Sequence, residues 1–447
     1  MTFGTSPKTA LAELVDGARF GLLHWRVLLL CALVLMLDGY DLSAMGFALP
    51  AIANAVGIPT AAFGPALSAS MVGVAIGSLA AGPLGDRYGR RFAIVGCFAL
   101  VGIGALSTTS ASSLHDFEMW RFFTGLGMGG VVPNAVALLS EYMPLRRRTF
   151  LVVAAFSTAA LGSSGGSLIA ALLVPRFGWQ AVFLVGGIFP LLVTVVAVFG
   201  LPESVFFLTR KSRFLEAASL SRRMGFTLPA QGAAGVDVPQ PAPVVAIGEL
   251  FRGNLRSATC LIWVLFIGTQ GLVFFMGGWL ATLLAKEGLP VKHALVALSA
   301  FHMGSFIVGL LVAWQSDRRS PEGMLAATYV SAAISVALLA AGGIQEPGVY
   351  VLCFTAGGGV VGASFCLGAL ASSYYPPHVR AMGLGWGLGV GRIGSITSPL
   401  LGGMALAAGW RVSVVLAAAV VPAVICSLVV LALARTRRSL SIVHQTL

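Results

Sequence analysis

Charged residues are scarce in this sequence. They make up 10% of its 447 residues, whereas 57% are hydrophobic. Soluble globular proteins carry about 25% charged residues. A chain with so few charges cannot cover a water-facing surface with polar groups, which excludes a soluble globular fold and indicates lipid as the solvent. Glycine is abundant instead, with 56 residues, and this suits helices that pack closely in a bilayer.

Cysteine is also scarce, and its positions have no C-x-x-C spacing. All six lie inside apolar runs, so we expect small buried hydrophobic residues and neither a disulfide framework, a zinc site nor another cofactor site: Cys31, Cys97, Cys260, Cys353, Cys366 and Cys426. A cleavable signal peptide is not apparent either. The first apolar run, from Val27, is too long for the core of a signal peptide, so we interpret it as a retained signal anchor.

Twelve runs of mostly apolar residues follow one another along the chain, each near the length of about 20 residues that a spanning helix needs. They predict an all-α membrane protein with spans at 27–50, 62–84, 92–110, 117–141, 149–174, 179–200, 257–284, 293–314, 323–342, 348–373, 380–407 and 411–434. One long hydrophilic stretch, 203–256, separates an amino-terminal unit (1–202) from a carboxy-terminal unit (257–447). Its basic start and its Pro/Ala/Gly tract around 229–246 predict a short surface helix followed by a flexible linker.

The net charge of +12 is explained by topology better than by a nucleic-acid partner, because Lys and Arg lie in short clusters between the apolar runs. With the amino terminus inside, the inner segments hold 22 of the 28 Lys and Arg residues, the outer loops 4 and the spans 2. This asymmetry follows the positive-inside rule and predicts that both termini are cytoplasmic. The two units also repeat: a shift of 231 residues places Asp86 on Asp317 and Gly178 on Gly409, which indicates a duplicated six-helix unit.

A long motif stands between the second and third spans. Its residues follow the order G-x-x-x-D-R-x-G-R-R, with Gly82, Asp86, Arg87, Gly89, Arg90 and Arg91. The motif resembles that of the major facilitator superfamily, which implies a transporter with twelve helices in two six-helix bundles related by a pseudo-two-fold axis. A carboxylate beside guanidinium groups at a tight turn can latch the two halves in one state. The alternative is a basic inner loop with a surface salt bridge of little energetic value.

Two further residues and the second copy of the motif join this predicted gate. The second copy, Asp317 and Arg318, is degenerate, since Ala313 stands where the glycine would be. Arg380 opens the eleventh span from the inner side. Glu141, near the inner end of the fourth span, is expected to face the arginine-rich loop 146–148, either as part of the latch or as a solvated residue.

Three segments carry a narrower resemblance. Asp38, Gly39 and Asp41 form a D-G-x-D pattern in the first span, a glycine-rich stretch follows Arg121 in the fourth, and another runs from Arg380 past Arg392 in the eleventh. Together they resemble the aromatic acid:proton symporter family over nearly the whole chain. That resemblance implies a monomer in a bacterial inner membrane that imports benzoate-like carboxylates with protons by alternating access, in the service of aromatic catabolism.

The two aspartates of the first span are the strongest candidates for proton coupling. Asp38 is about 11 residues into the span, or roughly 16 Å deep, near the middle of a bilayer core about 30 Å thick. Asp41 lies on the same helical face, and two carboxylates this close in a low dielectric resist joint ionisation, as a proton carrier requires. Arg121 enters from the outer side and should lie nearer Asp41. It serves either as a neutralising partner or as a snorkelling interfacial arginine.

Arg392 is the candidate for binding the substrate anion. It lies about 12 residues into the eleventh span, and the spans of the second half contain no acidic residue to pair with it. A substrate carboxylate can supply a bidentate partner. The alternative is a structural salt bridge across the cavity to Asp38.

Further residues are predicted to line the substrate site. His302 lies at membrane depth, where it either binds a ring substituent or the proton, or is a satisfied core histidine. The others offer polar or aromatic walls, and for each the alternative is a residue of the core or the lipid face: Gln270, Phe274, Asn134, Tyr40, Trp386 and Ser395. Two G-x-G-x-x-G patterns lie inside spans and therefore indicate close helix packing, not a nucleotide site.

The sequence thus favours proton-coupled import of an aromatic carboxylate. A rival within the same class is symport of another organic acid, hydroaromatic or dicarboxylic. A rival of another class is a receptor on the same scaffold that does not transport, although a receptor has no need of a titrating pair. An enzyme is not expected, because no nucleophile and base or metal ligands occur at membrane depth.

Overall fold

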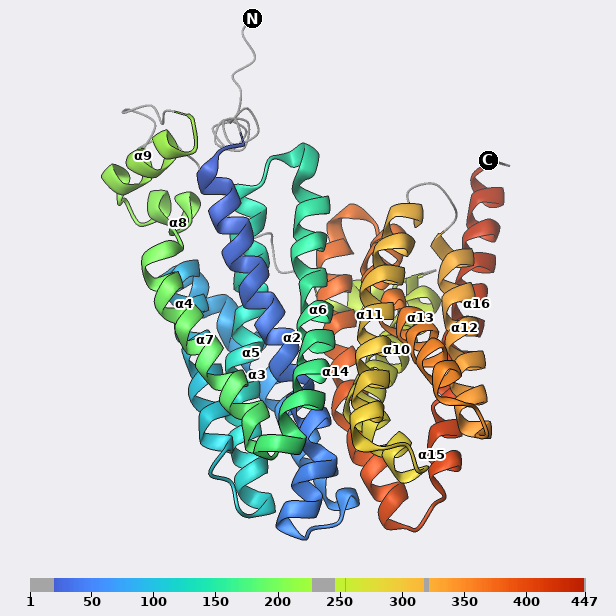
Figure 1. Ribbon diagram of the computed structural model, residues 1–447. Coiled ribbons are helices and arrows are strands. Elements are labelled where there is room, and N and C mark those ends of the chain that lie inside the picture. Colours follow the sequence, from blue (N-terminus) through green and yellow to red (C-terminus); the bar gives the residue numbers. More distant parts are fainter. Residues whose placement is uncertain (1–19, 227–245, 254, 317–320, 446–447) are drawn as a thin grey trace, which may run out of the picture.

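The structure is a computed structural model that describes residues 20–226, 246–253, 255–316 and 321–445. Its long helices run up and down in two adjacent bundles (Figure 1). The N-terminal half contains α2 (Leu22–Val56), α3 (Gly64–Tyr88), α4 (Arg90–Thr108), α5 (Leu114–Tyr142), α6 (Leu145–Phe177) and α7 (Gln180–Gly200). The C-terminal half contains α10 (Leu255–Lys286), α11 (Val291–Ser316), α12 (Pro321–Ala341), α13 (Glu346–Tyr374), α14 (Pro377–Ala407), α15 (Val412–Ala418) and α16 (Val420–Gln445).

The predicted spans match these helices closely, and the all-α membrane fold is confirmed. Eleven of the described helical segments are long and apolar enough to cross a membrane. The remaining predicted span, 380–407, the eleventh along the chain, is the 31-residue helix α14, which is not among those eleven helices. Glycines, serines and Arg392 dilute its apolar residues, and α14 packs against α10 and α3 while Leu388, Ile393 and Leu401 stay exposed. The last span is broken into α15 and α16 after Ala418.

Close backbone contacts at glycines repeat in the two halves. A Cβ on Gly125 of α5 would collide with the carbonyl of Ser70 on α3, and a Cβ on Gly357 of α13 would collide with the carbonyl of Phe301 on α11. Ser70 and Phe301 are 231 residues apart, the offset that the sequence repeat predicts. Gly125 and Gly357 lie in helices, not in a strand–helix turn, so the glycine patterns serve packing.

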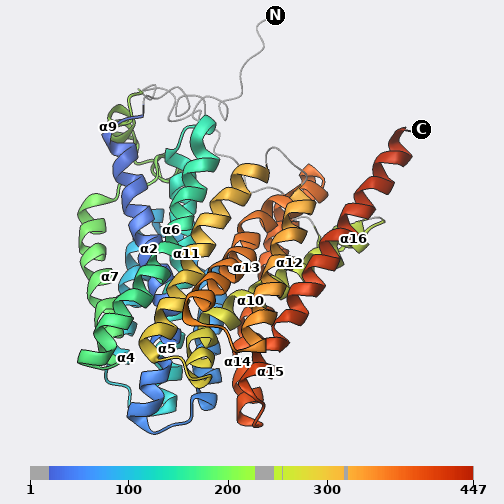
Figure 2. The same cartoon turned by 45° about the vertical axis from the view of Figure 1, so that its right-hand side comes forward.

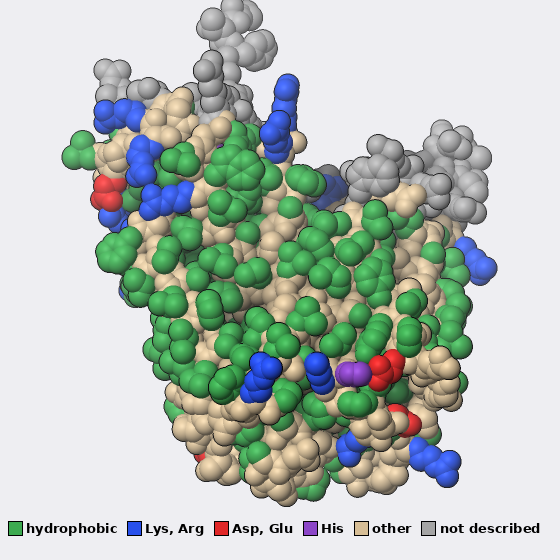
Figure 3. Space-filling view, in the orientation of Figure 1, with side chains coloured by type: hydrophobic (Ala, Val, Ile, Leu, Met, Phe, Trp, Pro, Cys, Tyr) green, Lys and Arg blue, Asp and Glu red, His purple; other side chains and the backbone are tan. Residues whose placement is uncertain are grey.

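The two halves share one core at one side of the molecule and have separate cores at the other. We call the side where α2 begins and α16 ends the terminal side, and the other the opposite side (Figure 1). Buried residues of both halves, from Phe47 and Phe63 to Trp279 and Phe301, form one cluster toward the opposite side. Toward the terminal side each half has its own cluster. The protein is therefore closed at the opposite side and divided at the terminal side, where Figure 3 shows a notch between the halves.

Hydrogen bonds between the halves lie toward the closed side. The Ser68 hydroxyl of α3 donates to the Ile396 carbonyl of α14 over 2.8 Å. The hydroxyls of Ser164 on α6 and Ser299 on α11 are 2.9 Å apart, where these two helices run side by side (Figure 2). Buried hydroxyl pairs of this kind hold the halves in register at modest cost, because each group finds a partner.

The described part of the central stretch contains two short helices and a 3-10 turn. They are α8 (Val205–Arg210), α9 (Phe214–Arg223) and η2 (Ile247–Phe251), so the predicted surface helix is two helices. The predicted linker falls largely on 227–245, outside the described residues. One expectation about cysteine is wrong: Cys260 is exposed on α10, whereas Cys31, Cys353, Cys366 and Cys426 are buried and Cys97 is half-buried. The Cys260 thiol lies on the helix surface and does not form part of the buried core.

Candidate functional site

Asp41 and Arg121 form a fully buried ion pair inside the N-terminal half. The Arg121 Nη1 donates to both Asp41 carboxylate oxygens over 3.2 Å, and Nη2 donates to the Asp41 carbonyl over 3.0 Å. Nη2 also donates to the Ser70 hydroxyl over 3.2 Å. Both side chains are buried, so Arg121 is not a snorkelling interfacial residue. Each of the two charges needs the other, because a single unpaired charge buried at this depth would be strongly destabilising.

Asp38 lies one helical turn before Asp41 but has a different environment. Its side chain is buried, and its Oδ1 has no hydrogen-bond partner. It interacts electrostatically with Asp41 and, across the boundary between the halves, with Arg392 of α14. No direct Asp38–Arg392 ion pair forms: both residues are described, and no nitrogen–oxygen distance between them falls within 4.0 Å. The structure thus separates the two aspartates into one paired and one unpaired carboxylate.

Arg392 is half-buried, and its guanidinium has no hydrogen-bond partner among the described residues. Gln270 of α10 packs against Gly391, the residue before Arg392, since a Cβ on Gly391 would lie 3.2 Å from Gln270 Cγ. Phe274, one turn further along α10, packs against the core of the N-terminal half. Arg392, Gln270 and Phe274 therefore gather where α10 and α14 meet the N-terminal half, as a shared site requires.

His302 on α11 is buried, and its Nε2 has no partner in the described part of the chain. The alternative that His302 is a core histidine with all its hydrogen bonds made is therefore not supported, since its Nε2 has no partner. Its ring meets the neighbouring Phe301 edge-on, with centroids 5.3 Å apart. A buried ring nitrogen without a partner is uncommon in proteins.

Four other residues predicted at the substrate site point elsewhere. Tyr40 donates from its hydroxyl to the Val182 carbonyl over 2.8 Å and packs within the N-terminal half. The Ser395 hydroxyl donates to the Arg392 carbonyl of its own helix. Trp386 stacks on Trp263 with centroids 6.3 Å apart and is 45% exposed. Asn134 lies in the cluster of gate residues described next. Its direction could not be predicted from sequence, because a helix that is apolar on all sides has no periodic pattern that indicates which face is buried.

The predicted gate is a cluster of polar side chains within the N-terminal half. Asp86 and Arg90 form a 2.8 Å ion pair, and Arg90 lies 3.8 Å from the Glu141 carboxylate. The Asn134 carbonyl oxygen accepts from Arg90 over 3.4 Å, and its amide donates to the Gly130 and Ala81 carbonyls. Glu141 therefore faces Arg90 and not the loop 146–148.

The turn of the motif requires glycine at one position. Gly89 has φ of 109°, and a Cβ there would collide with the carboxylate of Glu203. Glu203 in turn accepts from the Arg91 backbone N–H over 3.2 Å. Sequence analysis missed Glu203, which follows α7 and belongs to no motif. A Cβ on Gly82 would meet nothing within 4 Å, so its place in the motif has no packing reason here.

The remaining gate residues are exposed or outside the described residues. The Arg87 guanidinium lies over the Tyr88 ring, 5.4 Å from its centroid. Arg380 donates from Nε to the Tyr375 carbonyl over 3.4 Å. Asp317 and Arg318 lie outside the described residues. Among the residues described, no group of three or more His, Cys, Asp or Glu side chains could hold a metal ion.

Comparisons with known proteins agree with this architecture. Residues 31–395 match the sequence model of the Major Facilitator Superfamily. The chain is 35% identical over 413 residues to the 4-hydroxybenzoate transporter PcaK of Pseudomonas aeruginosa, covering 91% of this chain and 92% of that protein. It is 33% identical over 421 residues to a gallate transporter of Pseudomonas putida, covering 94% and 93%. The inward-open xylose transporter XylE from E. coli superposes with a TM-score of 0.73 at 16% identity, covering 91% and 95%.

The chain belongs to the Major Facilitator Superfamily and is a multi-pass membrane transporter. The resemblance predicted from the motifs is confirmed, since its relatives are named as transporters of aromatic acids. The similarity to XylE, at 16% identity, shows the shared fold alone.

Proposed function

We propose that this transporter is a symporter that carries an aromatic carboxylate together with a proton into the cell. The terminal side is then the cytoplasmic side of a bacterial inner membrane, as the distribution of Lys and Arg predicts. In this orientation the protein is closed to the outside and divided toward the cytoplasm.

The substrate class rests on two observations. The relatives named above carry 4-hydroxybenzoate and gallate, which are both aromatic acids with one carboxylate, and the match covers more than nine tenths of each chain. In this chain, Arg392 offers a guanidinium without a partner at the boundary of the halves. A planar guanidinium matches a carboxylate with two parallel hydrogen bonds. Gln270, which packs against Gly391, and Phe274, which packs against the N-terminal core, would supply an amide and an aromatic face for the ring.

The coupling rests on two ionisable groups placed across the boundary between the halves, buried Asp38, whose Oδ1 has no hydrogen-bond partner, and half-buried Arg392, which is the observation that carries this proposal. Without substrate, the Asp38 carboxylate compensates Arg392 across the boundary. When the substrate carboxylate binds Arg392, Asp38 faces a second negative charge and takes up a proton. One anion and one proton then cross together, so the charge within the site stays constant. Asp41 is neutralised by Arg121 throughout and holds the helix at this depth.

Uptake into proteoliposomes tests both parts of the proposal. Labelled 4-hydroxybenzoate, gallate, benzoate, a hydroaromatic acid and a dicarboxylic acid are compared with and without an inwardly directed proton gradient. Gradient-driven accumulation of the aromatic acids supports the proposal. Preference for a non-aromatic acid would favour the rival symporter, and saturable binding without any transport would favour the receptor.

A further inference from the structure

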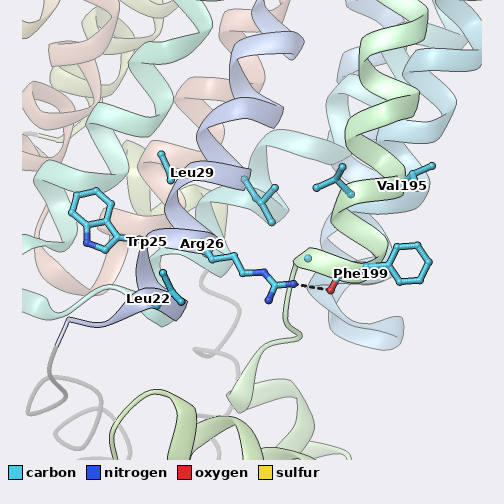
Figure 4. Close-up of a pocket in the computed structure, with 9 residues that line it drawn as sticks. Leu22, Trp25, Arg26, Leu29, Val195 and Phe199 are labelled. Carbon is cyan, nitrogen blue, oxygen red and sulfur yellow. Dashed lines mark hydrogen bonds between the residues drawn. The ribbon is translucent and has the colours of Figure 1, made fainter.

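A groove on the outer surface of the N-terminal half lies between the first residues of α2 and the last residues of α7 (Figure 4). Its volume is about 720 Å³, within the range of roughly 300–1,000 Å³ typical of small-molecule sites. The walls are apolar and widely exposed: Leu22, Leu29, Val195 and Phe199 are between 58% and 86% exposed. The groove is therefore separate from the boundary between the halves and opens to the surroundings of the helix bundle.

Arg26 is the one charged residue that lines this groove. Its Nη2 donates to the Phe199 carbonyl at the end of α7 over 2.8 Å, as Figure 4 shows. Arg91 of α4 likewise donates to the Val198 carbonyl. No carboxylate lies within 4.0 Å of the Arg26 guanidinium among the described residues. Arg26 is exposed, so its remaining N–H groups face the groove mouth with their charge unpaired.

The position of Arg26 relative to the membrane is that of a headgroup contact. It is five residues into α2, roughly 6 Å along the axis from the helix start. Further basic residues, Arg210 and Lys211, follow on α8, and Figure 3 shows Lys and Arg side chains gathered over this end of the molecule. Leu22 and Trp25 lie on the helix-start side of Arg26, and the apolar walls continue from Arg26 toward the bilayer centre with Leu29 and Leu30 of α2 and Val195 and Val196 of α7. A cationic mouth above an apolar trough matches a molecule with an anionic head and a hydrocarbon tail.

We infer that the groove between α2 and α7 binds an anionic phospholipid of the inner leaflet, with the phosphate on Arg26 and an acyl chain between Leu29 and Val195. The side of the membrane rests on the orientation proposed above, whereas the anionic preference rests on Arg26. The bound lipid would also brace α2, whose deeper turns carry Asp38 and Asp41.

Photo-cross-linking in vesicles of phosphatidylcholine with a minority of phosphatidylglycerol tests this inference. A photoreactive residue replaces Leu29 in the groove or, as the matched control, Leu172 of α6, which is 57% exposed away from the groove. We expect the probe at position 29 to capture phosphatidylglycerol enriched about fivefold over its share of the membrane, the effect of one arginine at an anionic surface. The probe at position 172 should capture lipids in proportion to the bulk.

Two variants separate the lipid site from a general charge effect. Arg26→Gln should abolish the enrichment at position 29, whereas Arg176→Gln, which removes an exposed arginine at the other end of the bundle, should leave it unchanged. Excess inorganic phosphate should not reduce the capture, because the acyl chain contributes to binding. Equal lipid composition at positions 29 and 172, enrichment that persists in Arg26→Gln, or competition by phosphate alone would each overturn the inference. Uptake of substrate measured in parallel confirms that the variants are folded.

Discussion

Asp38 and Arg392 stand on opposite halves of the transporter, close enough to interact electrostatically and too far apart for a direct ion pair. A pair split in this way can respond to a ligand, because a substrate carboxylate that reaches Arg392 replaces the attraction of Asp38. The buried pair of Asp41 and Arg121 cannot respond in that way, since its atoms already satisfy one another.

Replacing Asp38 by asparagine should uncouple transport from the proton. Asn is nearly isosteric and cannot take up a proton, so we expect exchange of labelled for unlabelled substrate to continue while accumulation driven by a proton gradient stops. Counterflow and gradient-driven uptake are measured on the same proteoliposomes. Undiminished accumulation against a gradient by Asp38→Asn would remove Asp38 from the coupling step.

Replacing Arg392 should weaken substrate binding by the energy of a charged hydrogen bond. Arg392→Ala is expected to lose about 1.5–3 kcal/mol, or roughly ten- to a hundredfold in affinity, and Arg392→Lys should bind poorly because an ammonium lacks the planar fork. Calorimetry on purified protein measures binding apart from transport. Arg411→Ala, at an exposed position before α15, is the control and should bind normally.

The double variant Arg392→Ala/Asp38→Asn distinguishes the two roles left open for Arg392. If Arg392 serves only to neutralise Asp38, removing both charges restores binding. If it binds the substrate, the double variant binds as weakly as Arg392→Ala. Recovery of near-native affinity would therefore assign Arg392 a structural role.

Removing one charge of the buried Asp41–Arg121 pair should destabilise the protein more than removing both charges. Asp41→Asn leaves the Arg121 charge buried without a counter-ion, and such a change typically costs about 3–5 kcal/mol. We expect a large fall in the thermal unfolding temperature of the purified protein for Asp41→Asn and for Arg121→Gln. The double variant should unfold at a higher temperature than either single variant. Single variants as stable as the parent would show that the pair has no structural role and would return Asp41 to the proton pathway.

The helices could be predicted from sequence because each apolar run has the length of a span. The pairing of Arg121 with Asp41 was also predictable, since both lie toward the outer end of their spans. The direction in which each side chain points could not be predicted, because helices that are apolar on all sides carry no periodic signal of orientation. Tyr40 points toward α7, and Asn134 points toward Arg90. Glu203 could not be found, since its role depends on Gly89 and Arg91, which are more than a hundred residues away in the chain.

The gate motif should act on turnover and not on affinity. The Asp86–Arg90 pair joins the last turn of α3 to the first residue of α4, and Asp86 is 54% exposed, so in this state it contributes only about 0.2–1 kcal/mol. We expect Asp86→Asn to lower the maximal rate strongly and to leave the apparent affinity nearly unchanged. Because the pair is weak in this conformation, such an effect would come from contacts that Asp86 makes in the other conformation. Glu216→Gln is the matched control, because Glu216 of α9, paired with Arg213, is 55% exposed, close to the 54% of Asp86, and lies outside the motif. Loss of affinity at an unchanged maximal rate would contradict a gating role for Asp86.

The closed side offers a test of the alternating conformations through one asymmetric contact. Gly46 of α2 meets the backbone of Gly277 on α10 so closely that a Cβ on Gly46 would collide with the Gly277 carbonyl, whereas a Cβ on Gly277 would meet nothing within 4 Å. Gly46→Ala should therefore strain only the conformation that is closed at the opposite side. Overpacking of this kind costs about 1–3 kcal/mol, which shifts a two-state equilibrium by roughly 5- to 150-fold.

Spin labels at Arg176 and Arg411, which are exposed in the two halves at the opposite side, would report this shift as longer distances in Gly46→Ala. The native cysteines are replaced first, since Cys260 is exposed. Gly277→Ala adds a methyl group to the partner residue on the other helix, where it meets nothing within 4 Å, and should leave the distances unchanged. Because we propose a substrate site between the halves, Gly46→Ala should also slow release at the terminal side while leaving binding from the opposite side intact. Identical distance distributions in the two alanine variants would mean that the Gly46–Gly277 contact does not hold the opposite side closed.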